Sequence, residues 1–352
     1  MTKAFVMLVL CVAIQPVCPA AHGQERAASR GLRNQMDSAL TRMTRRGYSG
    51  AALVARDGRI VLHKAYGLAD RERGIRNTTD TLFAVASITK VFTAAAILKL
   101  EMQGKLATGD LVSKYLGSFP GEKSGVQIHH LLTHTSGLVV KGAELDYSSR
   151  EAFIKSVKET PAAAKPGAEY QYLNAGYGIL AAVIEVASGM PYEKYLRQQL
   201  FDPAGMTSTG FAWEPRLDGA PVAVGYEGKT LASLKPAPRA PDDWDNRGPS
   251  GLVTTVGDLY KWVQALSANS VLSPEARRKM FTAYVNDEGY GWHVVKTAGG
   301  GTLVHRGGGL PEAESELHWY VDERTVLAFT VNNHIGFRKP VLAAFKHALR
   351  LR

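Results

Sequence analysis

A serine and a lysine lie one helical turn apart, as Ser87 and Lys90, where an apolar run typical of a helix begins. Residues spaced by three share a face of a helix, so the lysine amine can reach the serine hydroxyl. The amine can then take the hydroxyl proton, and the positive end of the helix favours the negative charge that develops on a substrate. Serine at a helix start is also a common capping residue. The pair alone is therefore compatible with a nucleophile or with a cap.

A second pair, Tyr172 and Asn174, is spaced by two residues just before another apolar, helix-like segment. On a loop, both side chains can face one cleft. A phenolate next to a lysine ammonium can act as a base, and an amide can bind a substrate carbonyl. Tyrosines before a helix can equally be packing residues.

The third group is His305, Arg306, Gly307 and Gly308, at the end of a strand-like run. Glycines in a strand allow another backbone to approach closely, and a histidine can offer a hydrogen bond or a positive charge. A histidine at the end of a strand is also often a plain structural residue.

The order of these three groups closely resembles that of the serine β-lactamase and penicillin-binding-protein superfamily, on its class C β-lactamase, DD-peptidase and family VIII esterase side. The S-x-x-K element is typical of that superfamily. Longer phrases carry the same resemblance, which runs from about Ser38 to Phe345: Phe83 to Lys90, Leu131 to Leu138, Tyr172 to Tyr177, Ala204 to Met206 and Gly251 to Leu259.

The resemblance implies an acyl-enzyme mechanism. Ser87 would attack an amide, lactam or ester carbonyl, while Lys90 and Tyr172 would move the proton. Asn174 would bind the acyl-side amide of the substrate. Water would then release the acyl group, and neither a metal nor an organic cofactor would be needed.

For the third element, the resemblance implies substrate binding by His305, Gly307 and Gly308. The backbone N–H groups of Ser87 and Gly308 would hold the oxyanion. His305 would replace the usual lysine, near the substrate carboxylate or the Tyr172 oxygen. If His305 must be neutral, activity should fall as the pH drops through a pKa near ~6.5. Arg306 stands where relatives carry a hydroxyl, and we expect it to face away from the cleft.

The resulting functional expectation is an exported serine hydrolase of the β-lactamase or D-amino-acid peptidase type, cleaving amides or lactams. A carboxylesterase of the same fold is the alternative, and a binding protein that has lost catalysis is a weaker one. The partners expected are a D-amino-acid peptide, a β-lactam or an ester, and not a nucleic acid. His130 and His134 are spaced for zinc on a helix, but no Glu or Cys completes a site there, so no metal is expected.

Residues 1–23 have the pattern of a secretory signal peptide: Lys3, a short apolar run, then small residues. We therefore expect a mature chain of residues 24–352 in the periplasm or outside the cell. Both cysteines, Cys11 and Cys18, lie in the leader, which excludes disulfides and thiol chemistry from the mature protein. The net charge of +10 permits attraction to an anionic cell envelope.

The fold expected is α/β (α+β) of the β-lactamase/transpeptidase type, an antiparallel sheet flanked by helices plus an inserted, mainly helical domain. Strand patterns flank Asp57 and Gly58 and return between residues 290 and 332, which assigns residues 30–85 and 285–352 to the α/β part. Residues 86–284 form the helical part, with helices expected at 88–103, 129–132, 151–158, 177–187, 192–200 and 256–267. Helices are also expected at 30–46 and 339–350, and irregular loops at 209–249.

Overall fold

The computed structural model describes residues 19–138, 145–238 and 242–351, with side chains described from residue 29 onward. Both cysteines and most of the predicted signal peptide lie outside these residues. Within the described part of the chain, no helix is both long and apolar enough to cross a lipid bilayer.

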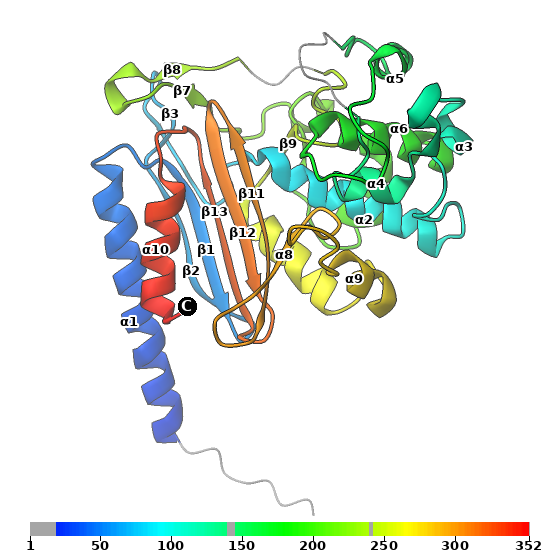
Figure 1. Ribbon diagram of the computed structural model, residues 1–352. Helices are drawn as coiled ribbons and strands as arrows, with labels where there is room; N and C mark the ends of the chain where they lie inside the picture. The colour runs from blue at the N-terminus through cyan, green and yellow to red at the C-terminus, as the bar shows by residue number, and fades with distance from the viewer. Residues whose placement is uncertain (1–18, 139–144, 239–241, 352) are drawn as a thin grey trace, which may run out of the picture.

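A six-stranded antiparallel sheet with the order β10-β11-β12-β13-β1-β2 forms the centre of the molecule (Figure 1). Its strands come from both ends of the sequence: β1 (Gly50–Arg56), β2 (Arg59–Tyr66), β10 (His293–Lys296), β11 (Thr302–Leu310), β12 (Ala313–Tyr320) and β13 (Thr325–Val331). The turn between β1 and β2 has Asp57 and Gly58 at φ of 51° and 75°. Two positive φ values are what a tight hairpin requires, and the predicted hairpin is confirmed.

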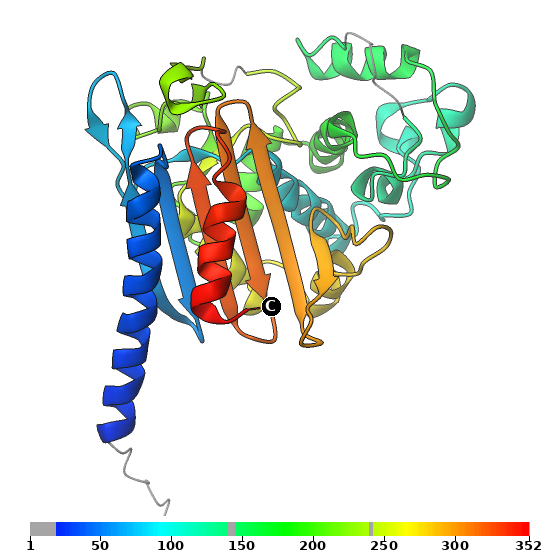
Figure 2. The same ribbon diagram turned by 60° about the vertical axis from the view of Figure 1, so that its left-hand side comes forward.

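The two faces of the sheet carry different layers. Helices α1 (Pro19–Thr44) and α10 (Arg338–Leu349) cover one face, here called the outer face (Figure 2). The core there includes Leu303 and Tyr320 of the sheet and Val341 of α10. The opposite, inner face packs against the helical middle of the chain, including α2 (Thr89–Met102) and α8 (Val256–Ser267). Because side chains of a strand alternate between faces, neighbouring residues of β11 belong to different layers.

The middle of the chain is mainly helical. Its further helices are α3 (Ser113–Leu116), η2 (Gly121–Gly125), α4 (Ile128–Leu132), α5 (Arg150–Glu159), α6 (Asn174–Ser188), α7 (Tyr192–Leu196), η3 (Arg197–Phe201), η4 (Pro215–Leu217), η5 (Leu231–Ser233) and α9 (Pro274–Met280). The remaining strands of the described chain are short: β3 (Leu68–Asp70), β4 (Ile75–Arg76), β5 (Phe83–Ala84), β6 (Gly210–Phe211), β7 (Tyr226–Glu227), β8 (Lys235–Pro236) and β9 (Leu252–Thr254).

The expected fold class is confirmed, and several boundaries agree closely with the sequence patterns. Helix α8 has the predicted bounds, because Thr255 caps it by accepting a hydrogen bond from the Asp258 N–H. Helix α9 and strands β5 and β9 are not anticipated by the sequence patterns. Strand β9 pairs with β5 and β6, segments distant in sequence, so its three residues carry no local signal.

Candidate active site

The predicted nucleophile Ser87 lies in a single 3₁₀ turn, η1 (Ala86–Ile88), that leads directly into α2. Ala86 has a φ of 47°, a left-handed conformation that is unusual for a residue with a side chain. Helix α2 is buried along most of its length, so the turn that contains Ser87 is continuous with a rigid helix. Lys90 follows in the first turn of α2, and its Nζ lies 3.1 Å from the Ser87 Oγ.

The Lys90 amine is fully buried and is held by two carbonyl oxygens. It donates to the Asn174 Oδ1 at 2.9 Å and to the Pro249 carbonyl at 3.0 Å. Burial lowers the pKa of Lys90 well below its usual value, and repulsion by Arg306 lowers it further. Both carbonyls can only accept, so in the neutral amine they take the two N–H groups. The lone pair is then directed at the Ser87 hydroxyl.

Tyr172 is the second group in contact with the Ser87 hydroxyl. Its phenolic oxygen lies 3.0 Å from the Ser87 Oγ and accepts a hydrogen bond from Arg306 at 3.0 Å. The His134 ring packs on the Tyr172 ring with 4.4 Å between centroids, and the His134 Nδ1 accepts the Leu173 N–H at 3.1 Å. His134 therefore positions the loop that presents Tyr172.

Arg306 faces the inner side of the sheet, so the expectation that it faces away from the cleft is wrong. Its side chain is 2% exposed and donates to the fully buried Glu288 at 2.8 Å and to Tyr172. The reason is the strand's alternation, because Arg306 shares its face with Val304, which belongs to the inner core. A guanidinium fork suits this position, since it can donate to a carboxylate and a phenol together.

His305 lies on the outer face, away from Ser87, contrary to its expected position near the substrate. It pairs directly with His293 on β10 and with His318 on β12. It shares its face with Leu303, a member of the outer core. Burial, together with repulsion by His318, lowers the pKa of His305 to about 3. A neutral imidazole on that face cannot replace a lysine charge in the cleft.

The register of β11 also changes the expected oxyanion donor. The Thr302 carbonyl accepts a hydrogen bond from the Val321 N–H. The backbone N–H and C=O groups of the even-numbered residues of β11 therefore point toward β12. The Gly308 N–H is thereby directed into the sheet, whereas those of Gly307 and Gly309 point toward the edge that β10 leaves uncovered beyond His305. Gly308 instead makes room for the turn that carries Ser87, because a Cβ there would lie 2.2 Å from the Val85 carbonyl. Only glycine lets β11 approach that turn so closely.

The structure thus brings together Ser87, Lys90, Tyr172 and Asn174 as the sequence predicts, and it separates His305 from them. Sequence reasoning missed Glu288, which is buried in a loop before β10, and the positioning contact of His134. Glu288 is part of no recognisable motif. The phrase from Leu131 to Leu138 did contain His134, but it gave no indication of the contact with Tyr172.

The low pKa of Lys90 predicts the pH dependence of acylation. If the neutral amine takes the Ser87 proton, kcat/KM should fall at low pH as Lys90 becomes protonated, and it should stay high at neutral pH. A pH profile of kcat/KM measures this directly. Activity that rises only toward pH ~10, where an ordinary lysine titrates, would contradict the role of the neutral amine.

His305 should contribute no titration to activity between pH 5 and 8, because its imidazole stays neutral over that range. We expect native protein and the His305→Gln variant to show the same dependence of kcat/KM on pH. A fall of kcat/KM near pH ~6.5 in native protein that is absent from the variant would instead support the sequence-based expectation that activity needs a neutral His305.

The comparisons with known proteins identify the family of the chain. The model of the family described as Beta-lactamase matches residues 33–349. The chain is 30% identical to esterase EstB of Burkholderia gladioli, over 88% of this chain and 92% of that protein. It is 38% identical to PbpX of Bacillus subtilis, provisionally described as a penicillin-binding protein, over 67% of this chain but only 59% of PbpX.

A solved structure supports the same relationship. The octameric penicillin-binding protein homologue from Pyrococcus abyssi superposes with a TM-score of 0.79 at 28% identity, covering 91% of this chain and 78% of that one. The family match spans nearly the whole described sequence, and the Ser87, Lys90 and Tyr172 side chains meet within hydrogen-bonding distance. The chain belongs to the beta-lactamase family and is a serine hydrolase.

Proposed function

We propose that the protein is an exported hydrolase of acyl esters that forms an acyl-enzyme on Ser87 and releases the acyl group with water. The proposed preference for esters rests on the contacts that the Arg306 side chain makes within the protein. Its guanidinium is buried and bound to Glu288 and Tyr172, so it is not available to a substrate carboxylate. Residues 1–23 support export by their signal-peptide pattern.

In the proposed acylation step, the Ser87 oxygen attacks the ester carbonyl while its proton passes to the Lys90 amine. The Arg306 donor stabilises negative charge on the Tyr172 oxygen. Backbone N–H groups of Ser87 and Gly309 hold the oxyanion, because the Gly309 peptide points toward the open edge of β11. The Tyr172 phenol then donates its own proton to the leaving alcohol. In deacylation the phenolate takes a proton from water, and Lys90 returns its proton to the Ser87 oxygen. Asn174 orients the acyl side through the amide nitrogen, while its Oδ1 stays on Lys90.

A second candidate is hydrolysis of a D-amino-acid peptide or a β-lactam. The same uncovered edge favours it, because an extended peptide can add to a strand through the Gly307 and Gly309 peptide groups. The likeness to PbpX points in this direction, and the likeness to EstB points to esters.

Turnover of matched substrates separates these functions. Native protein and the Ser87→Ala variant would receive p-nitrophenyl acetate, p-nitrophenyl butyrate, benzylpenicillin and a D-alanyl-D-alanine peptide. We expect ester turnover that depends on Ser87, with weak or no reaction of the two carboxylate-bearing substrates. Faster turnover of the penicillin or the peptide would favour the second candidate. Ester hydrolysis that Ser87→Ala leaves unchanged would contradict both.

Export is tested separately by the mass of the protein produced with its own N-terminus in a Gram-negative host. We expect the periplasmic fraction to contain a chain shortened by about the first 23 residues. A full-length chain retained in the cytoplasm would contradict export, without affecting the hydrolase assignment.

A further inference from the structure

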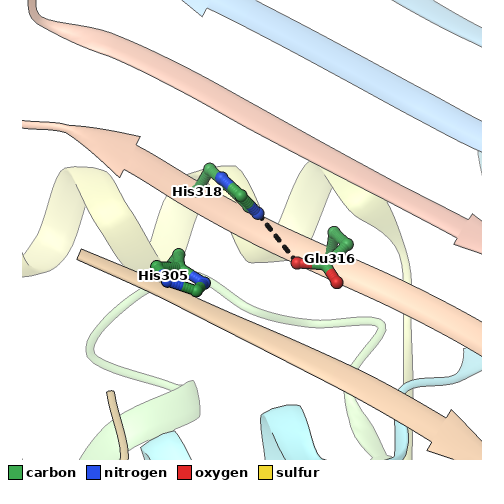
Figure 3. A group of neighbouring side chains, drawn as sticks. All are labelled: His305, Glu316 and His318. Carbon is green, nitrogen blue, oxygen red and sulfur yellow. Dashed lines mark hydrogen bonds and ion pairs between the residues drawn. The ribbon is translucent and has the colours of Figure 1, made fainter. Parts of the chain in front are cut away.

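Three side chains that commonly bind metals lie together on the outer face of the sheet, outside the active site (Figure 3). They are His305 of β11 and Glu316 and His318 of β12, and one ligand atom from each lies within 4.8 Å of the others. Ser87 contacts the inner face, so none of the three touches the catalytic groups described above.

The register of the two strands explains why the side chains meet. His305 lies directly opposite His318, and Glu316 lies opposite Gly307. Opposite residues on one face have Cβ atoms about 4.5–5.5 Å apart, which brings the two imidazoles side by side. Gly307 has no side chain, and a Cβ there would lie 2.5 Å from the Glu316 Oε1. The Glu316 carboxylate can therefore lean across Gly307 toward His305.

The surrounding contacts orient these groups as a metal site requires. The Glu316 Oε1 forms an ion pair with the Arg338 Nε at 2.7 Å, and the Oε2 lies 2.8 Å from the His318 Nε2. Hydrogen bonds to a ligating carboxylate fix its orientation in many metal sites. His318 is only 5% exposed, and its Nδ1 is buried without a hydrogen-bond partner. A buried imidazole with an unused nitrogen is poorly satisfied by the protein alone.

We propose that His305, Glu316 and His318 bind one divalent transition-metal ion, with Zn²⁺ the best match. Two imidazoles and one carboxylate are a common donor set for zinc. Such an ion would cross-link β11 to β12 next to the glycines that run past Ser87, so its role would be structural. Among the cations around the site, Arg338 is paired with Glu316, and Arg306 and Lys346 repel positive charge on His305.

The test is a Zn²⁺ titration of full-length, tag-free protein after treatment with a chelator, read by equilibrium dialysis with elemental analysis. The variants are His305→Gln and Glu316→Gln, and the matched control is His347→Gln, which removes an exposed histidine of α10. We expect one ion per chain for native and control proteins, and at least about 10-fold weaker binding in the two ligand variants. Zn²⁺ should also raise the Tm of native protein more than that of either variant.

Equal Zn²⁺ affinity in native protein and His305→Gln would overturn the proposal, as would native protein that takes up no ion at millimolar Zn²⁺. Cooperative unfolding of each variant in the metal-free state shows that it is folded. His305 is the safer variant because it is only half-buried, so a folding failure of Glu316→Gln still leaves one decisive comparison. Co²⁺ substitution gives an independent readout, since imidazole and carboxylate ligands change its visible absorption in native protein and not in the variants.

Discussion

Replacing Ser87 by alanine is expected to lower hydrolysis of every accepted substrate by at least about 10⁴-fold and to abolish the covalent acyl adduct. Loss of a nucleophile in a serine hydrolase removes the whole acyl-enzyme route and leaves only oxyanion binding and substrate positioning. The Ser87 Oγ lies 3.1 Å from the Lys90 Nζ and 3.0 Å from the phenolic oxygen of Tyr172. Steady-state kinetics and intact mass spectrometry with a slow-turnover ester measure the two losses.

A matched control for this prediction is Ser118→Ala, which removes a hydroxyl from an exposed loop between α3 and η2. It should retain native rates and the native adduct mass. Native protein that forms no adduct and shows no turnover with any ester, lactam or peptide would instead indicate a binding protein that has lost catalysis. Equal turnover by native and Ser87→Ala protein would show that the nucleophile lies elsewhere.

The part of the site that the sequence predicts well is the part built from local geometry. Ser87 and Lys90 are one turn apart in a buried helix, so their contact follows from helical spacing alone. Tyr172 lies just before α6 and Asn174 is the first residue of that helix, and their place beside Lys90 follows from the order of motifs that the family shares. The hairpin at Asp57 and Gly58 is equally local, because two residues with positive φ decide it.

The sequence prediction fails for the third group, His305 to Gly308, because it placed the wrong residue on the inner face of the sheet. In a strand, a shift of one residue moves a side chain to the other face of the sheet. The sequence does not say whether His305 or Arg306 faces the helical domain, because the two adjacent residues lie between an apolar residue, Val304, and the glycines from Gly307 onward. The hairpin between β11 and β12 decides it, since Leu310 pairs with Ala313 and so fixes the register back to Arg306.

Glu288 shows a second limit of sequence reasoning. It lies 18 residues before Arg306, in a loop, and it has no periodic pattern or motif around it. Its function emerges only when the fold buries it against Arg306, with His293 at 3.3 Å and His134 at 3.8 Å. A lone acidic residue in a loop is normally solvated, and only tertiary structure distinguishes this one.

The Glu288→Gln variant is expected to lose about 3–5 kcal/mol of unfolding free energy, the usual cost of removing one partner of a buried ion pair. Glu288 is fully buried and Arg306 is 2% exposed, so water cannot replace the missing charge. Glutamine keeps the size of the side chain, which confines the change to charge. The loss should be measurable as a lower urea midpoint, and hydrolysis should fall as well because Arg306 no longer holds the Tyr172 oxygen firmly.

The Asp57→Asn variant is the control for this loss, because it breaks the Arg324 pair at 3.6 Å between two side chains that are 70% and 63% exposed. It should leave the urea midpoint unchanged, since exposed pairs contribute little. Replacing both buried partners, as Glu288→Leu with Arg306→Met, should destabilise less than the sum of the single changes, because no unpaired charge remains. Additive losses, or a Glu288→Gln midpoint equal to the native one, would show that the buried pair does not hold the site together.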